Sequence, residues 1–116
     1  MDSRVQEAKG KFGKMMCSAA VLTTYKDLIG ITEAEAMLKA APMAGGRMET
    51  CGAILAAQEI LKVKAPEKVD MLEELFEKKN GSTLCKELKG RTGGPLLRSC
   101  PGCVEDASQI LEQLLG

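Results

Sequence analysis

The chemistry that this sequence could perform depends on its cysteines, Cys17, Cys51, Cys85, Cys100 and Cys103. The last two form a Cys-Pro-Gly-Cys segment, and CxxC spacing is shared by thiol redox sites and metal sites. With Pro101 as the first helical residue, Cys100 becomes the N-cap and Cys103 lies in the first turn, where unpaired N–H groups and the helix dipole favour negative charge. Arg98 adds a nearby positive charge. We therefore expect a thiolate of lowered pKa here, which would be nucleophilic, redox-active or metal-binding.

The other cysteines share parts of this setting. Cys51 follows the Gly45-Gly46 turn and Cys85 falls in the first turn after Ser82, so both are expected near helix starts. Cys17 lies on an apolar stripe, where a free cysteine often serves as a small core residue. We treat all five thiols as candidate catalytic residues.

The composition argues against several classes of function. The 16 basic residues balance the 16 acidic ones, and no run of Lys or Arg would neutralise a stretch of phosphates, so nucleic acid is not an expected partner. The chain contains no His, which removes the commonest general base and the commonest metal ligand together. Any metal would therefore depend on cysteine or carboxylate ligands.

Apolar residues recur at helical spacing along most of the chain, and no window shows the period-two alternation of a strand. Helices are expected over residues 3–28, 32–41, 48–63, 66–80, a short segment capped by Ser82 that contains Cys85 and Leu88, and 101–115. The first could be interrupted near Gly10 or Gly13, and residues 90–97 are expected to form a loop. The predicted fold class is all-α, a compact bundle of five to six helices in a single domain over residues 1–116.

Local signals mark several helix ends. Thr32 and Glu35 form a capping box at the start of the second predicted helix. Pro66 suits the first position of the fourth, and Asn80-Gly81 suits its end. The buried stripe of the last helix is expected to comprise Val104, Ala107, Leu111 and Leu114.

The order of the cysteines also resembles that of a known family. The stretches that carry the resemblance are Cys17-Ser18-Ala19-Ala20-Val21-Leu22, Gly45-Gly46 before Thr50-Cys51-Gly52-Ala53-Ile54-Leu55, Cys85-Lys86-Glu87-Leu88, and Cys100-Pro101 before the last helix. Together they resemble the redox-active protein family named C_GCAxxG_C_C for its cysteine pattern. The resemblance implies that the family cysteines are Cys17, Cys51, Cys85 and Cys100, and that Cys103 is an addition.

The central motif departs from the family pattern at two points. The family name reads Gly-Cys-Ala where this chain reads Cys51-Gly52-Ala53, and Ala56 stands where a second glycine is expected. The methyl group of Ala56 limits how closely another backbone segment can approach this helix. It therefore also affects the direction in which the Cys51 thiol points. Gly52 is the candidate cofactor-binding position of the motif.

Three kinds of chemistry compete for these thiols. In the first, Cys100 or Cys103 attacks a disulfide and a second cysteine resolves the intermediate, which needs no cofactor. In the second, an iron-sulfur cluster is bound, and in the third a structural zinc ion, in each case by Cys17, Cys51, Cys85 and Cys100. These four are far apart in the sequence and match no ferredoxin spacing, so we rank thiol-disulfide exchange or electron transfer first. A helical adaptor with incidental buried cysteines is a further alternative.

The sequence also bears on partners and location. A thiol redox protein, acting as an oxidoreductase or as an accessory to one, would exchange electrons with a redox partner protein or a small thiol, and so small a bundle could form a homodimer. No segment reaches the roughly 18 apolar residues of a membrane span. The N-terminal region lacks a signal-peptide cleavage site. A cytoplasmic location, where thiols are normally reduced, is therefore expected.

Overall fold

The structure of the chain, a computed structural model, describes residues 2–46, 49–90, 94 and 96–116. In these residues it contains seven α-helices, three 3₁₀ helices and no β-strand, so the predicted all-α fold class is confirmed. The elements are α1 (Asp2–Lys11), α2 (Cys17–Thr24), η1 (Lys26–Ile29), α3 (Glu33–Ala40), η2 (Ala41–Gly46), α4 (Gly52–Lys64), η3 (Pro66–Lys68), α5 (Val69–Asn80), α6 (Cys85–Leu88) and α7 (Cys100–Leu115). None of the described helices is long and apolar enough to cross a membrane.

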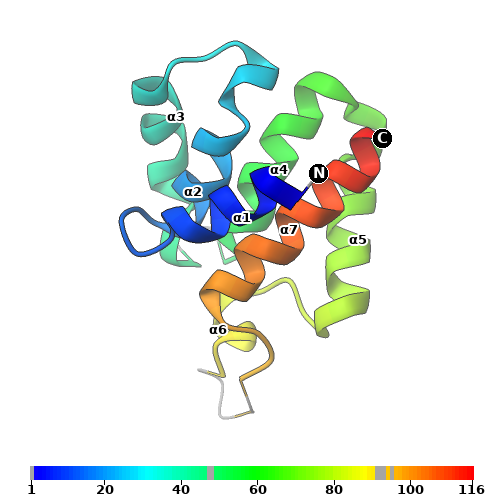
Figure 1. Cartoon of the computed structure of the whole chain (residues 1–116). Coiled ribbons are helices and arrows are strands. Elements are labelled where there is room, and N and C mark those ends of the chain that lie inside the picture. Colours follow the sequence, from blue (N-terminus) through cyan, green and yellow to red (C-terminus); the bar gives the residue numbers. More distant parts are fainter. Residues whose placement is uncertain (1, 47–48, 91–93, 95) are drawn as a thin grey trace.

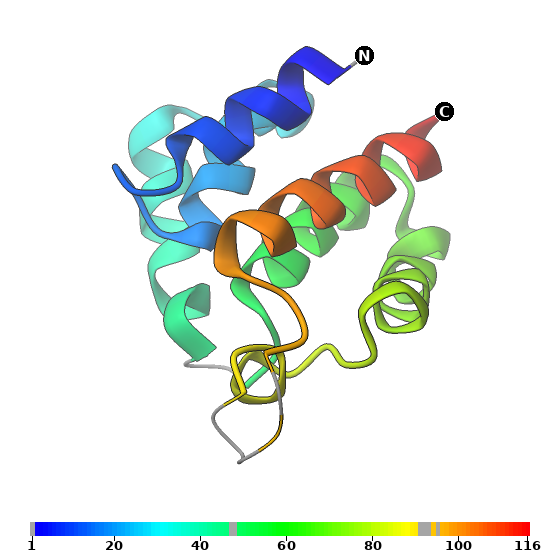
Figure 2. The same ribbon diagram turned by 60° about the horizontal axis from the view of Figure 1, so that its bottom comes forward.

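Two long helices, α4 and α7, form the centre of the bundle (Figure 1). α7 packs against α1, α4 and α5, and α4 also packs against α2. Figure 2 shows α4 and α7 side by side, with their N-terminal ends on the side of the molecule where α6 lies. The stripe predicted for the last helix is buried in this core, and it comprises Val104, Ala107, Leu111 and Leu114.

The first predicted helix, over residues 3–28, is divided into three elements. α1 ends at Lys11, and Gly13 then adopts a φ of +109°, which residues with a side chain rarely adopt. α2 begins at Cys17, and η1 follows Tyr25. The interruption is therefore at Gly13 and not at Gly10, which remains within α1. This division accounts for the larger number of α-helices, and it places Cys17 at a helix start.

The third predicted helix starts later than expected, because a short backbone bridge precedes it. Cys51 N–H donates to the Thr83 carbonyl, and Cys85 N–H donates to the Glu49 carbonyl, both at 2.8 Å. α4 begins directly after Cys51, which is its N-cap. The start expected at Met48 lies outside the described residues. The bridge ties the segment before α4 to the segment before α6.

Three other helix boundaries agree with the predictions. Both hydrogen bonds of the capping box are present, from Glu35 N–H to Thr32 Oγ1 at 3.1 Å and from Thr32 N–H to Glu35 Oε1 at 2.8 Å. Pro66 opens η3, which continues into α5, and Gly81 ends α5 with a φ of +89°. In the predicted loop over residues 90–97, the described residues are not helical, and residues 91–93 and 95 lie outside the description.

The caps of α6 and α7 differ from the predictions. Leu84, and not Ser82, is the N-cap of α6. α7 begins at Cys100, and its N-cap is Ser99, whose hydroxyl accepts from Gly102 N–H at 3.2 Å. A serine oxygen is a stronger acceptor than a cysteine sulfur, so Ser99 takes the cap and Cys100 becomes the first helical residue.

Candidate functional site

Three thiols meet where the N-terminal ends of α4 and α7 approach α6. Cys51 precedes α4, and Cys100 and Cys103 lie in the first turn of α7. The thiols of Cys51 and Cys103 hydrogen bond to each other. Both of these residues are only 1% exposed, whereas Cys100 is half-buried. Cys100 is therefore the most accessible of the three.

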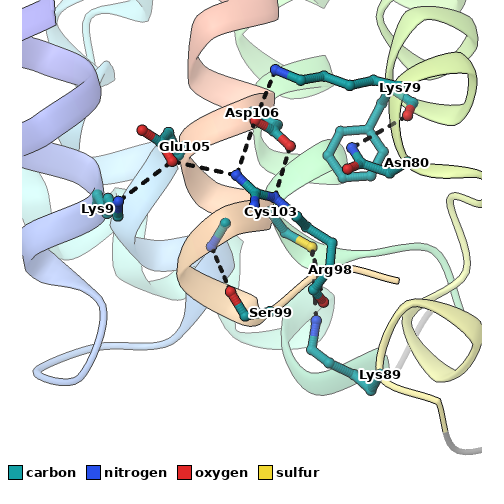
Figure 3. Close-up of polar contacts among 11 residues, drawn as sticks. Lys9, Lys79, Asn80, Lys89, Arg98, Ser99, Cys103, Glu105 and Asp106 are labelled. Atoms are coloured by element: carbon teal, nitrogen blue, oxygen red, sulfur yellow. Dashed lines mark hydrogen bonds and ion pairs between the residues drawn. The ribbon is translucent and has the colours of Figure 1, made fainter. Parts of the chain in front are cut away.

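Two backbone hydrogen bonds bring the end of α6 to the start of α7. The Leu88 carbonyl accepts from Leu97 N–H at 2.9 Å and from Arg98 N–H at 3.2 Å. The residue that follows α6 is Lys89, and its Nζ lies 3.8 Å from Cys103 Sγ (Figure 3). This backbone contact between the last residue of α6 and the segment before α7 places the Lys89 amine against the Cys103 thiol.

Lys89 is the cation of this site. Its ammonium also hydrogen bonds to the Cys100 thiol. Burial lowers the pKa of Lys89, but attraction to Cys103 and the hydrogen bond to Cys100 outweigh burial and hold the pKa above its ordinary value. Lys89 is therefore charged at neutral pH and contacts both cysteines of the CxxC segment.

The two buried thiols have pKa values shifted in opposite directions. The hydrogen bond with Cys51 lowers the pKa of Cys103, burial opposes this change, and the charge of Lys89 adds to the lowering. The hydrogen bond with Cys103 raises the pKa of Cys51, and burial raises it further. Of the two, Cys103 is therefore the one that loses its proton more readily, and Cys51 is the one that keeps its proton.

Arg98 is not the cation that faces the thiolate, which corrects the expectation from the sequence. Its Nε donates to Asp106 Oδ2 at 3.0 Å and its Nη2 donates to Glu105 Oε1 at 3.4 Å. Lys79 Nζ contacts the same Asp106 carboxylate at 3.0 Å, and that side chain is 3% exposed. Figure 3 shows the guanidinium pointing to these carboxylates, whereas the Arg98 carbonyl oxygen lies 4.0 Å from Cys103 Sγ.

No local signal in the sequence marks Lys89 as part of the site. It precedes Cys103 by 14 residues, and the contact exists because the intervening chain returns to the Leu88 carbonyl. The nearest signal is its place directly after the stretch Cys85-Lys86-Glu87-Leu88, which carries part of the family resemblance.

Gly52 lies where three elements meet. A Cβ atom at this position would lie 2.8 Å from the Met43 carbonyl oxygen in η2 and 2.9 Å from the Cys17 sulfur in α2. The Cys17 thiol therefore lies against the first turn of α4. Gly52 has this packing role, and its cofactor-binding role stays a prediction. Ala56 is fully buried one turn later, so its methyl group is accommodated in the core.

Cys85 is the first residue of α6, and it is buried. Its N–H group ties it to the segment before α4. Within the part of the chain that the structure describes, which includes all five cysteines, no disulfide is formed and no group of three or more Cys, Asp or Glu side chains could hold a metal ion. The thiol contacts described above join Cys51 to Cys103, and Lys89 to both Cys100 and Cys103. The catalytic and metal-binding roles of Cys17 and Cys85 stay predictions.

Comparison with protein-family models gives a match over most of the chain. Residues 15–114 match the family described as "Putative redox-active protein (C_GCAxxG_C_C)". The matched range includes all five cysteines and Lys89. No curated protein and no solved structure gives a match.

Proposed function

Because the chain belongs to the C_GCAxxG_C_C family of redox-active proteins, we propose that it works by thiol-disulfide exchange at Cys100 and Cys103. The observation that carries the proposal is the contact between Lys89 Nζ and Cys103 Sγ, which lie 3.8 Å apart. The thiolate is the reactive form of cysteine, and an adjacent cation favours this form at neutral pH. The site thus combines a dithiol with the charge that its chemistry needs.

Accessibility assigns different roles to the two cysteines. Cys100 is half-buried, so a substrate sulfur can reach it, whereas Cys103 is 1% exposed. Cys100 is therefore the attacking thiol. Cys103 lies one helical turn further along α7, and its thiolate resolves the intermediate that Cys100 forms.

The exchange consists of two transfers between sulfur atoms. The Cys100 thiolate attacks one sulfur of a substrate disulfide, which forms a mixed disulfide and releases the first substrate thiolate. The Cys103 thiolate then attacks Cys100 Sγ, which forms the Cys100–Cys103 disulfide and releases the second substrate thiolate. Both released thiolates take protons from solvent. The protein loses two electrons, and the substrate disulfide gains them.

Return to the dithiol state requires an electron donor. A redox partner protein or a small thiol can run the same two steps in reverse, because thiol-disulfide exchange is reversible. The chain would thus act as an oxidoreductase or as an accessory to one. The direction of net flow would depend on the reduction potentials of the two partners.

The proposal is tested by the products of oxidation. Reduced protein is treated with oxidised glutathione, and free thiols and intact mass are measured in the wild type, Cys100→Ser and Cys103→Ser. The wild type should lose two thiols without gaining mass from glutathione. Cys103→Ser should accumulate glutathione on Cys100, and Cys100→Ser should be oxidised much more slowly.

Two results would contradict the proposal. One is a Cys100→Ser variant that loses two thiols as fast as the wild type. The other is iron and sulfide in matching amounts in anaerobically purified protein, because the cysteines would then be cluster ligands.

A further inference from the structure

Cys51 extends the dithiol to a group of three thiols. It lies outside the CxxC segment, yet its thiol hydrogen bonds to that of Cys103, and each of these residues is 1% exposed. The exchange between Cys100 and Cys103 does not use Cys51. The proposed exchange therefore assigns no role to the buried Cys51 thiol, although this thiol contacts the resolving cysteine.

The backbone holds Cys51 and Cys103 against each other from the two ends of α6. Before this helix, Cys51 N–H donates to the Thr83 carbonyl at 2.8 Å. At its end, the Leu88 carbonyl accepts from Arg98 N–H at 3.2 Å, just ahead of α7. The segments that carry the two cysteines are thus anchored next to the two ends of α6, so the contact between the cysteines depends on the backbone of the fold.

Resting on the proposed function, we infer that Cys51 takes over the disulfide from Cys100, so that the oxidised protein carries a buried Cys51–Cys103 bond. The Cys51 sulfur attacks Cys103 Sγ, the Cys100–Cys103 bond breaks, and Cys100 leaves as a thiolate. The proton of Cys51 passes to Cys100. No oxidant or reductant is consumed, because one disulfide replaces another within the chain.

Oxidation of Cys103 is what makes Cys51 reactive. In the reduced protein the pKa of Cys51 is raised by its hydrogen bond with Cys103, by burial and by repulsion from the Cys103 charge. That charge disappears when Cys103 enters the disulfide with Cys100. Cys51 then loses its proton more easily, so the internal step follows the first exchange and does not compete with it.

After the transfer, the accessible cysteine is a thiol again and the disulfide lies in the protein interior. Cys100 returns to its thiol form beside Lys89, which already hydrogen bonds to it. The new disulfide joins two residues that are each 1% exposed, so small thiols cannot reach its sulfur atoms directly. Reduction must then run back through Cys100, which makes this residue the single entry point for electrons.

The test is to locate the disulfide in the oxidised protein. Reduced protein is treated with oxidised glutathione, quenched with acid, denatured, alkylated and digested with trypsin. Cys100 and Cys103 lie in one tryptic peptide, residues 99–116, and Cys51 lies in another, residues 48–62. A Cys51–Cys103 bond therefore links two peptides and leaves Cys100 alkylated, whereas a Cys100–Cys103 bond stays within one peptide.

The wild type should yield the linked peptides, with the alkyl group on Cys100 located by fragmentation. Cys51→Ala should lose the linked species completely and yield the bond within peptide 99–116 instead. A wild type that yields only the Cys100–Cys103 bond, with Cys51 alkylated, would overturn the inference and leave the proposed function intact. If neither protein forms an intramolecular disulfide, the proposed function itself fails.

Discussion

The Lys89 ammonium and the Cys103 sulfur lie 3.8 Å apart, although one follows α6 and the other lies in the first turn of α7. Helix-start N–H groups alone favour a thiolate at Cys103. Lys89 adds a full charge to that effect, and Cys51 adds a hydrogen bond. The thiolate therefore depends on three separate elements of the fold and not on the CxxC segment alone.

Replacing Lys89 by Gln should raise the pKa of Cys103, because the favourable charge is removed and burial remains. The pH dependence of thiolate ultraviolet absorbance reports this change. The matched control is Lys86→Gln, which removes the same charge from an exposed position on α6. Oxidation by glutathione disulfide at neutral pH should slow in Lys89→Gln and stay at the wild-type rate in Lys86→Gln. Equal titration curves for all three proteins would show that Lys89 does not act on the thiolate.

Replacing Gly52 by Ala should destabilise the protein by about 1–3 kcal/mol, the usual cost of forcing a methylene into a packed site. The added Cβ would lie 2.8 Å from a backbone oxygen, that of Met43, which cannot move without shifting η2. Urea unfolding under reducing conditions measures the loss. The control is Gly10→Ala in α1, where a Cβ has no neighbour within 4 Å and should stabilise the helix by about 0.5–1 kcal/mol. The same sign of change in both variants would contradict this account.

The Arg98 side chain passes so close to Gly102 that it leaves no room for a Cβ atom at this position. A Cβ at Gly102 would lie 2.6 Å from Arg98 Cζ, so alanine must displace the guanidinium from Asp106. We expect Gly102→Ala to cost about 0.5–1.5 kcal/mol, the net range for a hydrogen bond, because the Arg98 side chain is partly exposed to solvent. In an Arg98→Ala background the same change should be neutral or stabilising, because alanine suits a helix better than glycine.

The measurement for Gly102 is a double-mutant cycle by urea unfolding of the four proteins. In the wild type Asp106 also contacts Lys79 at 3.0 Å, so its carboxylate should keep a cation in each variant. An equal cost of Gly102→Ala in both backgrounds would show that the Arg98 side chain is not the reason for this glycine.

Local features of the fold are the ones that the sequence predicts well. The buried stripe of α7 and the capping box at Thr32 each depend on residues within a few positions of one another. The start of α7 shows the same principle in a case where the prediction was one residue off. Ser99 is a better cap than Cys100, and this preference is visible in the sequence. Short-range chemistry therefore determines where these helices begin and which face they bury.

The contacts that make the site depend on chain closure over longer distances. The pairing of Cys51 with Cys103 needs the bridge from Cys51 N–H to the Thr83 carbonyl. The contact of Lys89 needs the return of the chain to the Leu88 carbonyl. Neither of these two long-range backbone contacts is marked in the sequence by hydrophobic periodicity or by a motif. Sequence reasoning therefore identifies the reactive residue types but not which thiol meets which.

The single tyrosine of the chain offers a probe of the core at alkaline pH. Tyr25 is fully buried, and its hydroxyl donates to Glu112 Oε2 at 2.5 Å. Burial raises its pKa above the ordinary value of about 10, and the hydrogen bond to Glu112 raises it further. In the unfolded chain both effects are absent. Tyrosine therefore ionises at a lower pH in the unfolded chain than in the folded one.

The sign of the effect on stability follows from this difference. A group whose pKa is raised by folding contributes its full stabilisation below the unfolded pKa and loses it as pH rises towards the folded pKa. The free energy of unfolding should thus fall with rising pH above about 10. Tyr25→Phe should lack this part of the decline, and at neutral pH it should lose about 1 kcal/mol for the missing hydrogen bond.

Tyrosinate absorbance measures this directly, because the chain has no Trp and no other Tyr. In the native protein, the absorbance should appear only as the circular dichroism of the helices is lost. In urea, it should appear near the ordinary tyrosine pKa. Tyrosinate that forms near pH 10 while the helices remain intact would show that the contact between Tyr25 and Glu112 opens without unfolding, and that it does not hold α2 to α7.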